Sequence, residues 1–158
     1  RFPEFALEYA RLGIGMFGGS HGMGKLLLSP AISFETTISQ TRRIPGGEGV
    51  GYGAMDATQE DRTIAILPVG YGDGYPRHLS NGAGHVLIRG QRAPVVGRVC
   101  MDMTLVDITH IPSAEVGDDV VLFGIQPTLE EVAQSAGTIP YELIARISSR
   151  VARIHRGG

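Results

Sequence analysis

Cysteine is nearly missing from this chain, because Cys100 is the single one among 158 residues. That excludes an internal disulfide and weakly favours a reducing compartment. Long apolar runs are also missing: no stretch reaches the roughly 18 apolar residues that a membrane-spanning helix requires. An excess of one charge is missing too, since the formal net charge is −2 and only 19% of residues are charged. We therefore expect a cytoplasmic protein that binds neither nucleic acid nor membrane.

The chain also lacks an initiator methionine and a signal-peptide pattern, and it begins with a lone Arg1 shortly before PEFALEYA. From this we expect a fragment of a longer protein. Its five histidines are scattered, and none pairs with another histidine, a cysteine or a carboxylate at a metal-ligand spacing. No metal site is predicted.

Glycine and proline are abundant, with 23 and 9 residues, and together with the low charge they indicate a turn-rich, mainly β protein. Patterning predicts strands at 12–17, 31–43, 62–67, 85–88, 93–96, 99–108, 120–123 and 151–154. A short helix is expected near Pro3. Many short strands at close spacing favour a β-barrel or sandwich.

Two short helices are expected late in the chain. Thr128 and Glu131 have the spacing of a capping box, in which each residue satisfies a backbone N–H at the start of a helix. Gly137 is placed to end that helix. A second helix is expected over 141–148, with a further helical turn at 75–79 inside a long loop over 70–84.

A glycine-rich stretch, GGSHGMGK at 18–25, imitates a phosphate-binding loop. The spacing G-x-x-x-x-G-K is met from Gly19 to Lys25, but Leu26 stands where a magnesium-binding Ser or Thr is required. The following residues are broken by Pro30 and do not read as a helix. We interpret the stretch as a glycine-rich loop and not as a nucleotide site.

Two tyrosines, Tyr52 and Tyr71, are each flanked by glycines. Glycine on both sides suits a loop that presents a phenol to a cavity better than the interior of a strand. The alternative is a pair of aromatic residues that pack on a barrel end. A phenol with a pKa near ~10 becomes a useful base only when cations stabilise its phenolate, and Arg11 and Arg98 are candidates for that role.

Other polar residues are weaker candidates. Asp102 and Asp107 are five residues apart on one predicted strand and therefore on opposite faces. Asp73 in GDG reads as a turn residue. Cys100 reads as a buried strand residue, because no histidine near it in sequence activates its thiol.

Three separate motifs carry a family resemblance: GVGYGAMDAT, ILPVGYGDGYPR and APVVGRVCMDM. In order and spacing they resemble the C-terminal domain of the alanine racemases, which are pyridoxal 5′-phosphate (PLP) enzymes. RLGIGMFG resembles the last strand of the family's N-terminal (β/α)8 barrel, where R-P-G-I is usual. The resemblance implies a mainly β domain over 19–158, of the β-barrel type with two short late helices, preceded at 1–18 by the tail of that barrel.

The resemblance also implies residue roles. Tyr52 is similar to the catalytic tyrosine, which moves the α-proton on the face of the substrate opposite the catalytic lysine. Inversion needs a base on each face. Arg11 resembles the arginine that hydrogen-bonds the pyridine nitrogen of PLP, while Gly13 and Ile14 match backbone positions that hold its phosphate.

Further roles follow in the same way. Tyr71 matches a second tyrosine that narrows the substrate entrance, and Met101 matches a residue whose backbone amide meets the substrate carboxylate. Arg98 and Asp102 then line the access corridor. Ser149 stands where some members place a phosphate-binding tyrosine, and a hydroxyl is still able to donate there.

The resemblance implies a head-to-tail homodimer that interconverts L- and D-alanine, the latter for peptidoglycan. PLP is expected to be held mainly by the N-terminal barrel, which carries the Schiff-base lysine and a histidine that this chain lacks. We expect the chain alone to be inactive and to hold PLP poorly. Three rivals remain: a serine racemase, a fold type III amino-acid decarboxylase with Cys100 in its cysteine loop, and a non-catalytic β-barrel interaction domain.

Overall fold

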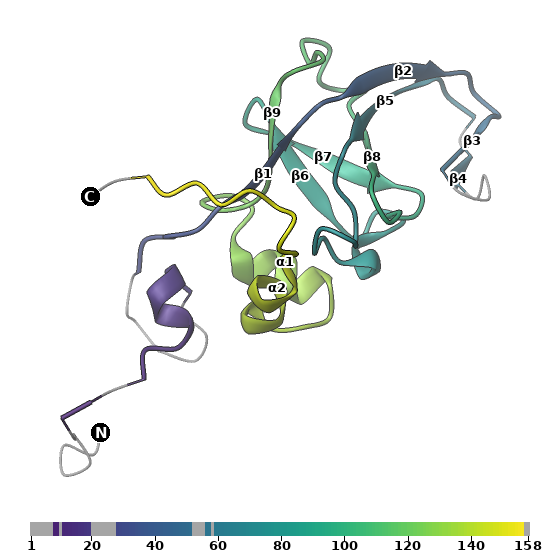
Figure 1. The fold of residues 1–158 in the computed structure, drawn as a ribbon. Coiled ribbons are helices and arrows are strands. Elements are labelled where there is room, and N and C mark those ends of the chain that lie inside the picture. Colours follow the sequence, from purple (N-terminus) through teal and green to yellow (C-terminus); the bar gives the residue numbers. More distant parts are fainter. Residues whose placement is uncertain (1–7, 10, 20–27, 52–55, 58, 157–158) are drawn as a thin grey trace.

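The fold was analysed in a computed structural model, which describes residues 8–9, 11–19, 28–51, 56–57 and 59–156 (Figure 1). The strands are β1 (Phe34–Thr37), β2 (Gln40–Ile44), β3 (Gly49–Val50), β4 (Asp56–Ala57), β5 (Arg62–Leu67), β6 (His85–Ile88), β7 (Gln91–Val96), β8 (Thr104–Asp107) and β9 (Asp119–Phe123). The helices are the 3-10 turns η2 (Ile14–Phe17) and η3 (Arg77–Leu79), and the α-helices α1 (Leu129–Ser135) and α2 (Pro140–Arg146).

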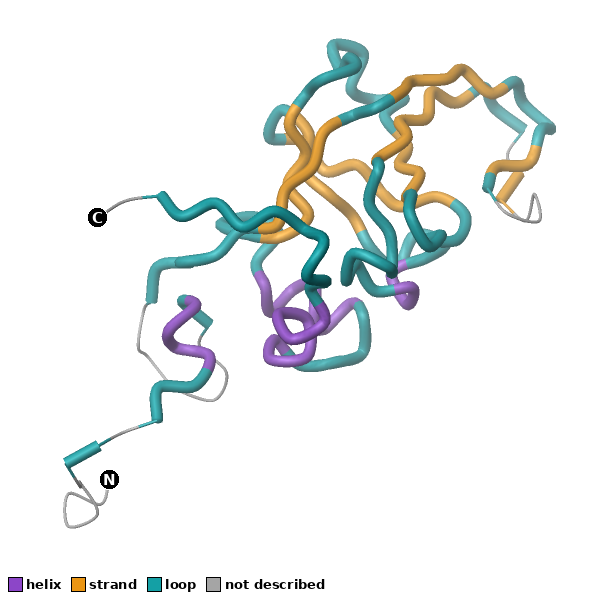
Figure 2. The backbone as a smooth tube through the Cα atoms, in the orientation of Figure 1, coloured by secondary structure: helices purple, strands orange, loops and turns teal. Residues whose placement is uncertain are grey.

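Seven antiparallel strands form one curled sheet in the order β1-β9-β6-β7-β8-β5-β2, with β3 and β4 as a separate small hairpin. The two edge strands, β1 and β2, are consecutive in the sequence. Between them, Ile38 N–H donates to the Asp118 carbonyl at 3.0 Å and Ser39 N–H donates to the Ile66 carbonyl at 2.9 Å. The chain therefore passes directly from one edge of the sheet to the other, and the sheet curls into a barrel-like shape (Figure 2).

Alternation of apolar and polar residues explains the strands. In β6 the buried residues are Val86 and Ile88, and in β8 they are Thr104 and Val106, which is the period of two that a half-buried strand requires. The side chains of Val86, Ile88 and Val106 join Leu67 of β5 and Leu122 of β9 in one core. The predicted mainly β class is confirmed.

The helices cover one end of this core. Thr128 and Glu131 form the predicted capping box, with Glu131 N–H to Thr128 Oγ1 at 3.1 Å and Thr128 N–H to Glu131 Oε2 at 2.8 Å. Gly137, in the left-handed region with φ 68°, follows α1 as predicted. Each α-helix has seven residues, and none in the described part of the chain has the length and apolarity to cross a bilayer.

Three predicted strands were wrong or too long, and a fourth, 31–43, is divided at Ile38 and Ser39 into β1 and β2. The segment 12–17 forms η2, because Met16 N–H donates to the Gly13 carbonyl and Gly18 N–H to the Gly15 carbonyl instead of to a neighbouring strand. Of 99–108 only β8 is a strand, since Cys100 N–H closes a turn on the Met103 carbonyl at 2.9 Å.

The third correction concerns 151–154, which is not a strand. The Arg153 side chain donates to the carbonyls of Ile147, Ser148 and Val151, so the segment is folded back on the residues that follow α2 and does not extend along a sheet edge. The helix expected near Pro3 and most of the glycine-rich loop at 18–25 lie outside the described residues. The predicted domain boundary at residue 18 stays a prediction.

Candidate active site

Three segments that are far apart in the sequence meet beside the end of β5. They are the loop 69–75 with Tyr71, the turn 99–103 with Met101, and the segment 147–151 that follows α2. Tyr71 N–H donates to the Cys100 carbonyl at 3.0 Å, and Gly72 N–H donates to the Met101 carbonyl at 2.8 Å. Ser148 N–H donates to the Asp73 carbonyl at 3.0 Å, which attaches the third segment to the first.

The glycines around Tyr71 let these backbones approach. A Cβ on Gly70 would lie 2.2 Å from the Cys100 carbonyl oxygen, and one on Gly74 would lie 2.7 Å from the Arg146 carbonyl oxygen. Gly74 also has φ 111°, which disfavours any side chain. The sequence prediction that these glycines serve to present a phenol is therefore incomplete, because close contact between loops requires them independently.

The side chains of Tyr71 and Met101 nevertheless face outward. Tyr71 is 42% exposed and Met101 is 53% exposed, and Met103 beside them is exposed as well. A buried phenol in the same loop, Tyr75, behaves differently: it is 1% exposed, and burial raises the pKa of its hydroxyl. Of the two tyrosines in this loop, Tyr71 is the accessible one.

The chain that leads into Tyr52 passes close to Arg98. Tyr52 itself lies outside the described residues, but Gly51 before it is described. A Cβ on Gly51 would lie 3.3 Å from Gly97 Cα and 3.6 Å from Arg98 N. Both glycines have positive φ, 78° and 61°. Gly51, the residue before Tyr52, therefore lies beside the backbone of half-buried Arg98, which is two residues before Cys100 in the sequence.

Asp102 and Asp73 are joined by a residue that the sequence analysis did not identify. Arg150 donates through Nε to Asp73 Oδ1 at 2.7 Å and through Nη2 to Asp102 Oδ1 at 2.6 Å. Asp73 is a turn residue as predicted, because its Oδ2 accepts from Gly70 N–H at 2.9 Å. Asp102 is in the turn before β8 and not on a strand with Asp107, so the argument from opposite strand faces was wrong. The only sequence feature that pointed to Arg150 was its position next to the predicted site residue Ser149.

Of the residues predicted to meet PLP, Arg11, Gly13 and Ile14 lie in the N-terminal segment and Ser149 lies after α2. Arg11 and Gly13 are exposed, as is Ser149 after α2. Ile14 N–H donates to the hydroxyl oxygen of Tyr141 at 3.1 Å, so this amide points toward an oxygen acceptor outside its own turn. Among the described residues, the contact of the Ile14 amide is with Tyr141 at the start of α2 and not with Ser149 beyond its end.

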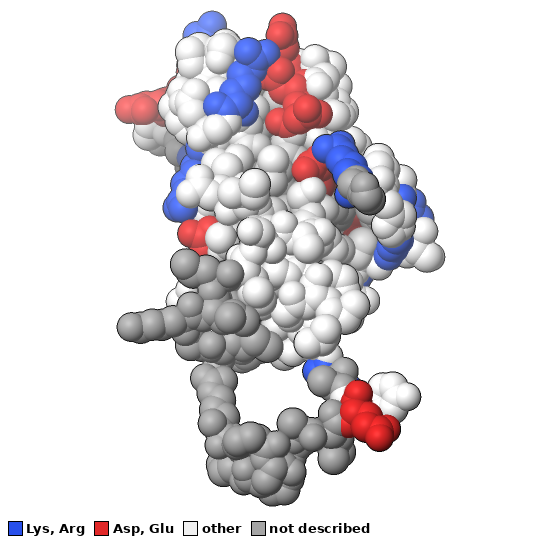
Figure 3. Space-filling view, turned by 90° about the vertical axis from the view of Figure 1, so that its left-hand side faces the viewer, with Lys and Arg blue, Asp and Glu red and all other residues white. Residues whose placement is uncertain are grey.

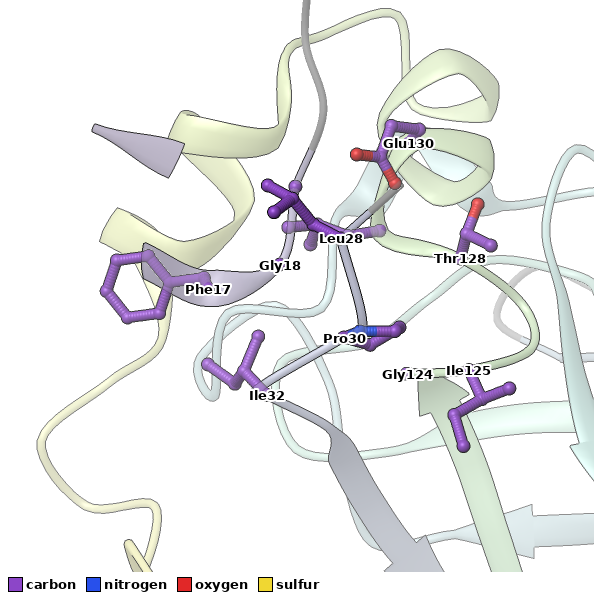
Figure 4. A pocket seen from close by; sticks show the side chains of 11 residues that line it. Phe17, Gly18, Leu28, Pro30, Ile32, Gly124, Ile125, Thr128 and Glu130 are labelled. Carbon is purple, nitrogen blue, oxygen red and sulfur yellow. The ribbon is translucent and has the colours of Figure 1, made fainter. Parts of the chain in front are cut away.

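Two hollows lie elsewhere. One, of about 270 Å³, lies between the N-terminal segment and the region from the end of β9 to the start of α1 (Figure 4). Its lining includes Phe17, Leu28 and Pro30 from the first and Ile125, Thr128 and Glu130 from the second. The second, of about 600 Å³, is polar and open beside Asp107 and His110. Neither includes a predicted site residue.

Charge and metal-ligating residues add no further centre. On the face seen in Figure 3, basic and acidic side chains are interspersed around a broad uncharged area. Within the described ranges, no three His, Cys, Asp or Glu residues are grouped so as to hold a metal ion. Cys100 is half-buried in the turn 99–103 and not in a strand as predicted; its Sγ is 3.5 Å from the Arg98 carbonyl oxygen.

Comparison with known proteins extends across the whole domain. The profile "Alanine racemase, C-terminal domain" matches residues 31–155. The chain belongs to this family.

Relatives agree with that membership. An alanine racemase of Halothermothrix orenii is 43% identical over 162 residues, covering 98% of this chain and 42% of the relative. One from Desulfovibrio desulfuricans is 42% identical over 158 residues, covering 97% of this chain and 42% of the relative. This member of the alanine racemase family therefore spans less than half the length of these relatives.

Solved structures agree as well. The biosynthetic alanine racemase of Pseudomonas aeruginosa superposes with a TM-score of 0.84 at 38% identity, over 91% of this chain and 41% of that chain. The alanine racemase of Bartonella henselae "with covalently bound pyridoxal phosphate" gives 0.83 at 36% identity, over 89% of this chain and 40% of that chain. The predicted family and fold are confirmed, which disfavours the decarboxylase, nucleotide-binding and interaction-domain interpretations.

Proposed function

We propose that this chain is the C-terminal part of an enzyme that interconverts L- and D-alanine with PLP, and that Tyr52 moves the α-proton on one face of the substrate. The observation that carries the proposal is the family match, which runs through all three motifs. The finer proposals are a cytoplasmic location, supply of D-alanine for peptidoglycan, and a head-to-tail homodimer.

Tyr71 and Met101 are proposed to form the substrate entrance. Their loops are hydrogen-bonded to each other through adjacent backbone groups, so the phenol and the Met101 backbone belong to one unit. Both side chains are exposed, which leaves them accessible to a substrate or to another subunit. A fixed backbone amide is a suitable donor to a carboxylate, because it is already oriented before the substrate arrives.

Tyr52 is proposed to act as a base beside Arg98. The contact between Gly51 and Gly97 supports this arrangement, since these glycines directly precede Tyr52 and Arg98 in the sequence. A cation near a phenol favours the phenolate and so makes proton removal easier at neutral pH. Arg98 would supply such a cation.

The residues proposed to meet PLP, three in the N-terminal segment and Ser149 after α2, carry donors of the kind that bind a phosphate or a pyridine nitrogen. The Ile14 amide donates to the Tyr141 hydroxyl oxygen, whose place a phosphate oxygen would take, and Arg11, Gly13 and Ser149 are exposed. Arg11 would hold the pyridine nitrogen, and the other three would hold the phosphate. When bound, PLP supplies the electron sink that makes the α-proton of an amino acid removable.

The dimer is proposed because the exposed apolar side chains of Tyr71, Met101 and Met103 gather on the two entrance loops. Exposed apolar groups in one place are typical of a surface that another protein covers. In a head-to-tail pair, these loops would serve the cofactor of the partner subunit.

The test uses the full-length enzyme that contains this chain, in deuterated water. Exchange of the α-proton is followed separately from L-alanine and D-alanine, in the wild type and in Tyr52→Phe. We expect the substitution to abolish exchange mainly from the L side, with a loss of at least ~10²-fold, the lower end for a positioned acid–base group.

The matched control is Tyr75→Phe, which removes a phenol hydroxyl from a buried position of the same domain. Exchange in that variant should equal the wild type. If Tyr52→Phe exchanges both enantiomers as the wild type does, Tyr52 is a packing residue and the proposed role is wrong.

A further inference from the structure

Arg150 joins two carboxylates that belong to different loops. Asp73 is 77 residues away from it in sequence and Asp102 is 48 residues away, yet both accept from one guanidinium, at 2.7 and 2.6 Å. A guanidinium has several donors in a fixed plane, so it is able to bind two carboxylates at once where an ammonium binds them as a point charge. These contacts raise the pKa of the Arg150 guanidinium, through Asp73 first and Asp102 second.

Each carboxylate is directly connected to a proposed entrance residue. Asp102 follows Met101 in the chain, at the tip of the turn that Cys100 N–H closes on the Met103 carbonyl. Asp73 is fixed at its other oxygen by Gly70 N–H, in the loop that carries Tyr71. Movement of Arg150 would therefore displace both the loop that carries Tyr71 and the turn that carries Met101.

The charges at this place do not cancel. Two carboxylates share one guanidinium, so these three groups sum to a charge of −1, and without Arg150 the two carboxylates would sum to −2. Asp102 is 59% exposed, so its charge reaches solvent next to Met101. A substrate carboxylate that approaches the Met101 amide would meet this charge, and like charges at close range oppose binding.

We propose that Arg150 is a positioning residue for the substrate carboxylate. It holds the Asp73 and Asp102 carboxylates toward itself and away from the entrance, and it orients the turn that presents the Met101 amide. This inference rests on the proposed function, since it assigns the carboxylate to Met101. Because an exposed ion pair adds little to stability, Arg150 should act on substrate binding more than on folding.

The experiment compares Arg150→Gln, Arg150→Lys, Asp102→Asn and the double variant Arg150→Gln/Asp102→Asn in the full-length holoenzyme. Arg150→Gln should raise KM for L-alanine about tenfold and change kcat less than about twofold, as expected when ground-state and transition-state binding are lost equally. Arg150→Lys should fall between it and the wild type, because the charge stays and the two-pronged geometry is lost.

The double variant separates charge from scaffolding. Removing the Asp102 charge from Arg150→Gln should reverse most of the rise in KM. A purely structural role instead predicts that KM of the double variant is as high as that of the single variant, or higher. Arg43→Gln is the matched control, since Arg43 pairs with Asp61 at 2.7 Å. Arg43 lies opposite Thr63, near the beginning of β5, while the entrance loop follows the end of β5. Its KM should equal the wild type.

Hydrogen exchange in the same variants gives a readout that does not depend on catalysis. Arg150→Gln should speed exchange of the Tyr71 and Gly72 amides, which bond to the turn 99–103. An unchanged KM together with unchanged exchange overturns the inference. If the wild-type enzyme does not racemise alanine, the proposed function fails, and exchange alone then decides whether Arg150 holds the two loops.

Discussion

The β domain and the segment before it differ in how their apolar residues are used. In the β domain, Leu67 of β5 and Leu122 of β9 are fully enclosed, each at 0% exposed. In the segment 11–19, Leu12 is 69% exposed and Met16 and Phe17 are exposed too, while Ile14 alone is buried against the core. One region supplies its own core, and the other joins that core through a single side chain.

This difference explains why the segment is not a strand. A strand leaves its backbone N–H and C=O groups unpaired unless a neighbouring strand accepts them. The described part of the chain offers the segment no such neighbour, and its Met16 and Gly18 amides bond within a 3-10 turn. In the proposed full-length protein, a (β/α)8 barrel would supply that neighbour and cover Leu12 and Met16.

The largest expected effect comes from a matched pair of leucines. Leu67→Ala should lower the free energy of unfolding of this chain by about 3 kcal/mol, because it removes a fully buried side chain and leaves a cavity. Leu12→Ala should change it by less than about 0.5 kcal/mol, as surface substitutions usually do. Urea unfolding of both variants measures the difference. Equal losses of stability would show that the segment 11–19 is packed as tightly as the core of the β domain.

A smaller effect tests the glycines at the entrance. Gly70→Ala should cost about 2 kcal/mol, because its Cβ would lie 2.2 Å from a backbone oxygen of Cys100 and the two loops would have to separate. Gly90→Ala is the control: its φ is +75° but nothing lies within 4 Å of its Cβ, so it should cost about 1 kcal/mol from backbone strain alone. Thermal unfolding of the two variants is compared. A Gly70 variant no less stable than the Gly90 variant would contradict close contact between the loops.

Sequence patterning predicted the parts of the fold that local chemistry determines. β5 and β6 were predicted with the bounds that the structure gives, because their apolar residues are bordered by turn residues. The capping box of α1 depends on Thr128 and Glu131 alone and was predicted as well. The segments 12–17, 99–103 and 151–154 were mispredicted because they form local turns and bonds where a strand needs a distant partner, and 31–43 was predicted without its break between β1 and β2.

The candidate site shows the same division. Motif order predicted Tyr71 and Met101 as site residues, and the structure brings their loops together. Motif order did not point to Arg150, because its proposed role depends on two carboxylates that are distant in sequence. Nor did it point to Tyr141, which contacts Ile14 from 127 residues away. Tyr52 stays a prediction, because it lies outside the described residues.

The smallest expected effect is a pH dependence confined to the β domain. Burial first, and then Arg92, lowers the pKa of His85 on β6, while Glu131 opposes the shift. Its Nε2 has no hydrogen-bond partner within the described residues. Because the unfolded chain binds a proton more readily, with a pKa of about 6.5, His85 contributes no penalty above that pH and destabilises the fold as the pH falls below it. Unfolding temperatures measured from pH 7.5 to 5 should therefore fall less in His85→Gln than in the wild type. His155→Gln, which removes an imidazole from an exposed position, is the control. Parallel curves for the wild type and His85→Gln would show that His85 is as accessible to protons in the folded domain as in the unfolded chain.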